Sequence, residues 1–169
     1  NILIVSRYGL IEKTTNGGIN WQNYSNILYS SINSICFSYM NTGFAAGYKY
    51  FQNKSIFKTT DQGNNWFELT SIPDSNFYSI YFIDVNTGFA GGYHSDVFKT
   101  TNSGQNWNLT ILQENSSIRD IKFINSLTGF LSSSKGTIYK TTNTGTTWNR
   151  VNYDINSGYL FKLSFPSQT

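Results

Sequence analysis

Hydrophobic and polar residues alternate along this chain with a period of two, which is the spacing of side chains on one face of a β-strand. Residues 79–110 show the pattern in four short runs, 79–83, 88–93, 96–100 and 106–110, separated by turn-forming residues. No apolar stripe with helical spacing continues for more than about ten residues. The pattern therefore predicts an all-β protein of short antiparallel strands.

The sequence also repeats itself. A nine-residue motif, Lys-Thr-Thr-Asx-x-Gly-x-x-Trp, occurs at 13–21, 58–66, 99–107 and 140–148. All four tryptophans of the chain occupy its last position, with spacings of 45, 41 and 41 residues. A second motif, ending in Thr-Gly-Phe, occurs at 41–44, 86–89 and 127–130. Because a period of about 40 to 45 residues is typical of propeller blades, we predict a β-propeller with four repeats, each a four-stranded antiparallel blade.

Each residue type that recurs in the four copies of the nine-residue motif has a structural role. The Asx side chain and the first threonine hydroxyl can hydrogen-bond the backbone of a tight turn. The glycine supplies a positive φ, and the tryptophan packs its ring against the inner layers of the blade. We therefore interpret these residues as structural rather than ligand-binding. They are Thr14, Asn16, Gly18, Trp21, Thr59, Asp61, Gly63, Trp66, Thr100, Asn102, Gly104, Trp107, Thr141, Asn143, Gly145 and Trp148.

The motif resembles the BNR or Asp-box repeat, Ser/Thr-x-Asp-x-Gly-x-x-Trp, of β-propellers such as sialidases, sortilin-like receptors and xyloglucanases. The preceding Thr-Gly-Phe makes the chain most similar to the photosystem II stability/assembly factor-like propellers, which also recur in secreted bacterial proteins. Three of the four Asx residues are Asn rather than Asp, which departs from the strict motif. The resemblance implies a propeller fold and leaves function open, because propellers host many activities.

The repeats begin and end inside a blade. Residues 1–5 align with a second strand, whereas 159–166 align with a first, inner strand, with Phe165 in the column of the inner-strand phenylalanines. We expect the last strand to complete the first blade, closing a four-blade ring within one domain of residues 1–169. Two alternatives stay open: the chain is a segment of a larger ring of about six to eight blades, or two copies complete one ring.

Charge and hydropathy narrow the classes of function. The chain carries 12 Lys and Arg against 9 Asp and Glu, and it has no run of like charge, so we expect no nucleic-acid partner. No apolar run approaches the roughly 18 to 20 residues that cross a bilayer, so we expect no membrane insertion. The abundance of Asn, Ser, Thr and Tyr and the single Cys are common among bacterial secreted proteins, and we expect an extracellular, cell-surface or periplasmic location.

Residues for metal or nucleophilic chemistry are scarce. The single cysteine, Cys36, lies in an apolar run and is interpreted as a small buried thiol, and the single histidine, His94, lies in a predicted exposed turn. One Cys and one His exclude an internal disulfide, a cysteine-based metal cluster and a Cys/His nucleophile pair. We therefore expect no metal site and no cofactor.

The resemblance to sialidases invites a test of enzymatic function. A sialidase site needs three converging arginines, but Arg7, Arg119 and Arg150 occupy different positions in the repeat. A glycosidase with paired carboxylates needs two acids across one cleft, and the spacing of the acidic residues favours no pair. We expect no enzymatic activity, and a glycoside hydrolase fragment is the least favoured alternative.

The predicted loops favour binding. Loops at one rim of a propeller converge on its axis, and here they are rich in Tyr, Phe, Asn and Ser, which suit protein or sugar contacts. Because these loops differ between repeats, we expect a protein-interaction or structural module that binds a protein partner or self-assembles. A lectin-like, glycan-binding propeller is the alternative. The candidate rim residues are Tyr29, Phe77, Tyr78 and Tyr159.

Overall fold

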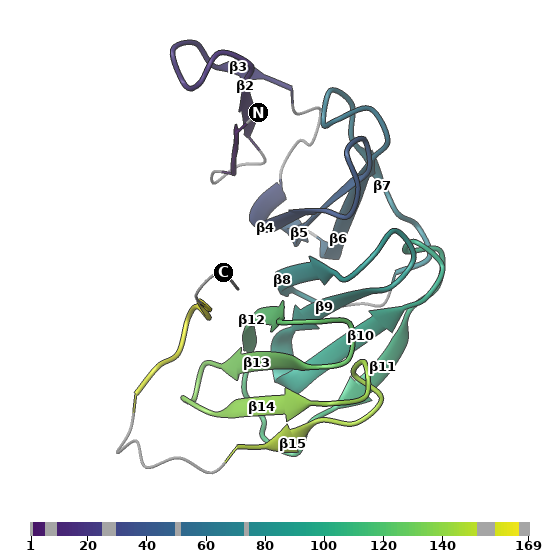
Figure 1. Ribbon diagram of the computed structural model, residues 1–169, viewed down its shortest axis with the longest axis vertical. Coiled ribbons are helices and arrows are strands. Elements are labelled where there is room, and N and C mark those ends of the chain that lie inside the picture. The colour runs from purple at the N-terminus through teal and green to yellow at the C-terminus, as the bar shows by residue number, and fades with distance from the viewer. Residues whose placement is uncertain are drawn as a thin grey trace.

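The short apolar strands pair into four antiparallel sheets, and each sheet is one blade of a β-propeller. The structure is a computed structural model and describes residues 2–5, 10–24, 30–49, 52–72, 75–151 and 158–165. Figure 1 shows the blades following one another along an arc, with the N-terminal blade at one end and the C-terminal blade at the other. The predicted all-β propeller built of antiparallel blades is confirmed.

Three of the blades have four strands each, and in each sheet every strand pairs with its neighbour in sequence. The second blade contains β4 (Ser30–Phe37), β5 (Gly43–Lys49), β6 (Gln52–Thr59) and β7 (Phe67–Glu68). The third contains β8 (Phe77–Phe82), β9 (Gly88–Gly92), β10 (Asp96–Thr100) and β11 (Asn108–Ile111), with the 3-10 turn η2 (Tyr93–Ser95) between β9 and β10. The fourth contains β12 (Ile118–Phe123), β13 (Gly129–Ser133), β14 (Ile138–Thr141) and β15 (Asn149–Arg150).

The first blade has three strands among the described residues: β1 (Ile2–Val5), β2 (Ile11–Thr14) and β3 (Gln22–Asn23). Ile2 pairs with Thr14 in the same register in which Gly43 pairs with Thr59 in the second blade. The strand β1 is therefore a second strand, as its alignment predicts, and the inner position of this blade has no strand within the described chain.

The C-terminal segment 158–165 differs from the predicted strand over 159–166. Its described residues form an irregular chain beside β12, and residue 166 lies outside the described residues. An inner strand forms its ladder with a second strand, and within the described residues none lies alongside this segment, so regular β-structure does not develop. Completion of the first blade by this segment stays a prediction.

The hydrophobic core lies between neighbouring blades. The rings of Phe44 and Phe82 stack with centroids 3.8 Å apart, and Phe89 and Phe123 repeat the contact at 4.9 Å in the next pair of blades. Such stacked aromatic pairs add roughly 0.5–1.5 kcal/mol to the free energy gained from burial. A β-carbon on Gly88 would lie 2.5 Å from the Phe82 ring, so the Thr-Gly-Phe motif needs glycine where the inner-strand phenylalanine crosses.

The nine-residue motif forms the same turn in every blade. In the second blade, Thr59 Oγ1 accepts a hydrogen bond from the Gly63 N–H at 2.9 Å and donates one to Asp61 Oδ1 at 2.8 Å. Asp61 Oδ1 in turn accepts the Asn65 N–H at 2.9 Å. The motif glycine has a positive φ in each copy, which only glycine adopts readily. Equivalent bonds to the motif threonine and Asx come from Gly18, Asn20, Gly104, Asn106, Gly145 and Thr147.

Candidate binding site on the axial face

The inner strands of neighbouring blades lie side by side on the concave side of the arc, where Figure 1 shows β4, β8 and β12 together. Each inner strand is joined to the next by a hydrogen bond. The next strand donates a backbone N–H, and the acceptor is the side chain three residues before the inner-strand phenylalanine. These bonds run from Ile80 to Ser34 Oγ (3.2 Å), from Ile121 to Ser79 Oγ (3.2 Å) and from Leu163 to Asp120 Oδ2 (2.9 Å). Segment 158–165 therefore continues the axial series that the three strands begin.

An axial cavity of about 330 Å³ opens among these strands. Its polar and aromatic lining comes from three inner strands and the C-terminal segment, with Asn33, Cys36, Tyr81, Asp120, Lys122 and Lys162 contributing side chains. No blade supplies the cavity alone, because each inner strand contributes only one part of its wall.

Asp120 is the buried carboxylate of this cavity, with 3% of the residue exposed. Besides the Leu163 N–H, it accepts the Ser79 hydroxyl at 3.3 Å, and Lys162 Nζ lies 3.8 Å from Oδ1. A buried charge needs such partners to offset its lost hydration. These partners offset the negative charge of Asp120. Lys122, whose ammonium lies 5.5 Å from the centre of the Tyr81 ring, adds a positive charge to the axial face.

Cys36 and Tyr81 have structural partners in the cavity wall. The Cys36 sulfur accepts the Phe82 N–H at 3.4 Å, and burial raises the pKa of this thiol, which lowers its fraction of nucleophilic thiolate. Burial also raises the pKa of Tyr81, whose hydroxyl donates to the Phe123 carbonyl at 3.3 Å. Both groups are therefore held neutral at pH 7, and both link one blade to the next.

Arg119 lies between two aromatic rings at the rim of the axial face. Its guanidinium carbon is 4.3 Å from the centre of the Tyr78 ring and 5.8 Å from that of Phe161. The Tyr159 and Phe161 rings stack with centroids 6.1 Å apart, so Tyr159 extends the aromatic surface. We call Tyr78, Arg119, Tyr159 and Phe161 the axial rim. Within the described part of the chain no acceptor pairs with the Arg119 guanidinium, and its Nε is buried without a partner.

The structure places the predicted rim residues in different environments. Tyr29 lies outside the described residues. Phe77 is wrongly predicted to be available to a partner, since it is fully buried and packs edge-on against Phe98, with centroids 5.5 Å apart. The pairing of β8 with β9 has a β-bulge between Phe77 and Ser79, where Phe77 packs into the core and Tyr78 lies against Arg119. Tyr159 is 76% exposed and lies on the axial rim.

Sequence reasoning missed Arg119 and Phe161 as rim residues. Both lie four positions before an inner-strand phenylalanine, as Tyr78 does in the third blade. Reading down this column of the repeat would have found them, because equivalent inner-strand positions face equivalent directions in successive blades.

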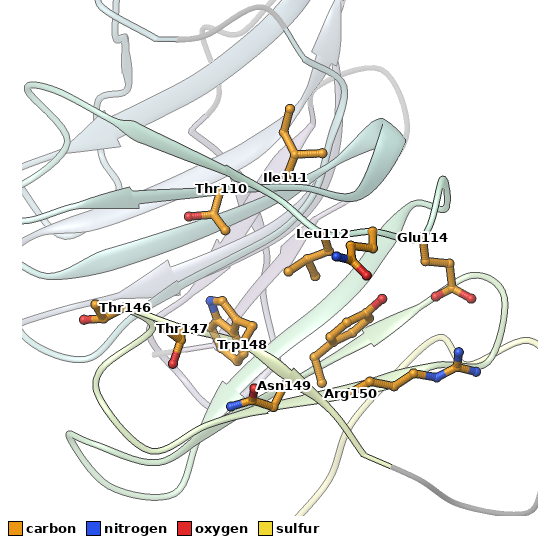
Figure 2. A pocket seen from close by; sticks show the side chains of 11 residues that line it. Thr110, Ile111, Leu112, Glu114, Thr146, Thr147, Trp148, Asn149 and Arg150 are labelled. Atoms are coloured by element: carbon orange, nitrogen blue, oxygen red, sulfur yellow. The ribbon is translucent and has the colours of Figure 1, made fainter.

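A second hollow, of about 650 Å³, lies at the periphery between the third and fourth blades. Figure 2 shows side chains of 110–114 and of 146–150 on its two sides, with Glu114 and Arg150 toward the same end in this view. Thr110 occupies the repeat position of Leu69, whose Cδ1 is placed 3.0 Å from a β-carbon built on Gly104 in the preceding pair of blades. The shorter Thr110 lines the hollow.

The described residues hold no group of three or more His, Cys, Asp or Glu side chains that could bind a metal ion. His94 lies in the exposed turn η2, and its Nδ1 is 2.9 Å from Asn115 Oδ1. No helix in the described part of the chain has the length and hydropathy to cross a membrane.

The sequence matches no protein-family model and no curated protein. A structure of YCF48 bound to D1 peptide is 26% identical, with a TM-score of 0.63, over 72% of this chain and 40% of its own. YCF48 from Cyanidioschyzon merolae is 18% identical, with a TM-score of 0.70, over 95% of this chain and 58% of its own. An ancestral GH74 enzyme is 23% identical, with a TM-score of 0.72, over 88% and 22%. This chain thus spans between about a fifth and three fifths of these propeller proteins, and the similarity covers most of its arc.

Proposed function

We propose that this chain is a non-catalytic binding and scaffold propeller whose axial rim binds a protein segment carrying a carboxylate. We place it in the photosystem II assembly factor-like branch of BNR-type propellers and in an extracellular, cell-surface or periplasmic location in a bacterium. The observation that carries the proposal is the guanidinium of Arg119, held between Tyr78 and Phe161 without an acceptor in the described chain.

The chemistry of this arrangement suits an anionic ligand. The Tyr78 and Phe161 rings restrict the Arg119 side chain, so less side-chain entropy is lost when its donors are paired. A planar fork of N–H donors matches the two oxygens of a carboxylate, and such charge-assisted bonds contribute roughly 1.5–3 kcal/mol. Lys122 on the same inner strand adds attraction for an anion.

The exposed rings favour a polypeptide as the carrier of this carboxylate. Tyr159 and Phe161 are 76% and 58% exposed. Phe161 lies beside Arg119, and Tyr159 stacks on Phe161. Aromatic residues next to an arginine are enriched where proteins bind each other. The complex of YCF48 with a peptide supports the same class of ligand, since a protein similar to this chain binds one.

The buried carboxylate of the axial cavity gives no support to hydrolysis. Asp120, the buried acid of the axial cavity, is already bonded to Ser79 and Leu163 and lies beside Lys162. A general acid in a glycosidase needs a free approach to the glycosidic oxygen. Asp120 acts here as a link between blades, which favours binding over catalysis.

Peptide binding tests the proposal directly. A fluorescein-labelled peptide, Leu-Phe-Ala-Ala-Leu-Ala, is titrated with the 169-residue chain in two forms, with a free and with an amidated C-terminal carboxyl. We expect the free-acid form to bind at least tenfold more tightly. Arg119→Gln should abolish this difference, whereas Arg150→Gln, an exposed arginine on the outer strand β15, should retain it.

Three outcomes would contradict the proposal. Equal affinity for both peptide forms would remove the carboxylate as the recognised group. Binding of neutral oligosaccharides such as cellohexaose or xyloglucan heptasaccharide, with no binding of either peptide, would support the glycan-binding alternative. Release of reducing ends from those oligosaccharides would show an enzyme.

A further inference from the structure

The peripheral hollow lies in the seam where the third and fourth blades pack together, and it shares no residue with the axial rim. Its volume of about 650 Å³ falls within the range of roughly 300–1,000 Å³ that is typical of small-molecule sites. Residues 110–114 form one wall and residues 146–150 form the other, as Figure 2 shows. The hollow is therefore a second candidate site, formed by two blades.

The apolar part of the lining is built into the core. Leu112, Tyr139 and Trp148 line the hollow, and all three are mostly buried in the hydrophobic cluster that joins these two blades. Their positions are set by core packing, so the apolar base of the hollow is formed before any ligand binds.

Trp148 differs from the motif tryptophans of the two preceding blades. The indole N–H of Trp66 donates to the Gly63 carbonyl at 3.1 Å, and that of Trp107 donates to the Gly104 carbonyl at 3.2 Å. The indole N–H of Trp148 is buried and has no acceptor among the described residues. An unpaired buried donor lowers stability, so an acceptor oxygen that enters beside this ring stabilises the seam.

The two charged residues of the lining are Glu114 and Arg150, which lie toward the same end of the hollow in Figure 2. The carboxylate of Glu114 accepts the Ser133 hydroxyl at 3.1 Å and the Thr137 hydroxyl at 2.8 Å, and these bonds hold it in place. Arg150 is exposed on β15. Because the two charges are opposite, the lining is neutral in sum and favours a neutral ligand over an ion.

The polar groups of the lining are of mixed hydrogen-bonding character. The Arg150 guanidinium only donates, the ionised Glu114 carboxylate only accepts, and the side chains of Gln113, Asn149 and Thr147 do both. A ligand that matches them needs several closely spaced groups that donate and accept at once. Hydroxyl groups have this property.

We propose that this hollow binds a neutral saccharide. The C–H face of the sugar packs on the apolar base at Leu112 and Trp148, and a ring hydroxyl accepts from Arg150 while it donates to Glu114. A purely apolar ligand would displace water from these polar groups without replacing its hydrogen bonds, which disfavours binding. Saccharide binding is a function separate from the carboxylate recognition proposed at the axial rim.

Isothermal titration calorimetry tests the proposal with four neutral hexasaccharides, which are cellohexaose, maltohexaose, laminarihexaose and N-acetylchitohexaose. We expect at least one of them to bind the 169-residue chain with a Kd below about 1 mM. Arg150→Gln removes the charged donor and should weaken that binding at least fivefold. Asn149→Ala should weaken it as well, whereas Asn108→Ala should not, since Asn108 has the equivalent position in the third blade and does not line the hollow.

The two binding sites are distinguished by a pair of arginine variants. Arg119→Gln should leave the Kd for the saccharide unchanged and abolish the preference of the axial rim for a free carboxylate. Arg150→Gln should have the reverse effect on the two ligands. Either proposal can therefore fail while the other holds.

Three results would overturn the saccharide proposal. The first is no binding of any of the four hexasaccharides up to about 5 mM. The second is equal affinity of the wild type and Arg150→Gln, or a loss of binding in Arg119→Gln, because the sugar would then lie outside the hollow. The third is tighter binding of glucuronate or glucosamine than of every neutral probe, which would make charge the recognised property. Circular dichroism melts establish that each variant is folded.

Discussion

The Leu163 N–H donates to Asp120 Oδ2 over 2.9 Å, and this bond takes the place that bonds to serine hydroxyls take between the preceding inner strands. The bond holds the irregular segment 158–165 beside β12, at the position that the repeat predicts for an inner strand. Asp120 also accepts the Ser79 hydroxyl, so one carboxylate connects the third blade, the fourth blade and the C-terminal segment.

Removing this carboxylate should destabilise the protein. Asp120→Ala leaves the Ser79 hydroxyl and the Leu163 N–H without their acceptor, and we expect a loss of about 1–3 kcal/mol in the free energy of unfolding. Asp120→Ser restores the residue type of the other seams and should lose less than half as much. Urea unfolding followed by tryptophan fluorescence measures both, and equal losses would show that the acceptor role is not what matters.

The buried hydroxyl of the motif threonine should contribute to the free energy of unfolding. Thr59→Val removes the acceptor of the Gly63 N–H while keeping the shape of the side chain, so we expect a loss of about 1–3 kcal/mol. For a chain of this size that corresponds to a fall in Tm of about 2–10 °C. Thr59→Ser keeps the hydroxyl and serves as the control in calorimetry. A larger loss from serine than from valine would assign the effect to the methyl group.

Asp61 should make the stability of the second blade's motif turn depend on pH, which an asparagine at that position would not do. Hydrogen bonds from the Asn65 side chain and backbone lower the pKa of Asp61 to about 2. Because the folded-state pKa lies below the unfolded value of about 3.9, its stabilisation is present above about pH 4 and is lost as the pH falls toward 2. Solvent screening keeps this contribution below about 1 kcal/mol.

Asp61→Asn measures that contribution. The variant should be less stable than the wild type at pH 7, and the difference in the free energy of unfolding should shrink between pH 4 and pH 2. The reciprocal variant Asn102→Asp, at the same position of the third blade, should acquire the same dependence. A difference that is constant with pH would show that Asp61 titrates normally.

Gly88 should not tolerate a side chain. Its β-carbon in Gly88→Ala would lie 2.5 Å from the Phe82 ring, which is itself stacked on Phe44, so we expect overpacking to cost about 1–3 kcal/mol or more. Gly17→Ala places its β-carbon in open space and carries only the strain of φ +72°, about 1 kcal/mol. Thermal melts of both variants test this, and similar Tm values would mean that the Phe82 ring moves aside.

The strand positions could be predicted from the sequence because the alternating hydrophobic residues of each blade are buried. Trp66, Gly63 and Thr59 recur at fixed offsets, and the turn that they form depends on bonds within nine residues. The binding surface was less accessible. Phe77 and Tyr78 are adjacent aromatics in one loop-to-strand segment, and only the direction of β8 decides that the first is buried and the second faces Arg119.

By itself the sequence determined the repeat, the antiparallel blades, the turn chemistry and the inner-strand register of Phe165, because all of these rest on local spacing and on side chains that bond their own turns. Only the tertiary structure decided which side chains share the axial face. That arrangement depends on the rotation between blades, and that rotation is set by packing of rings such as Phe44 on Phe82, which lie far apart in the chain.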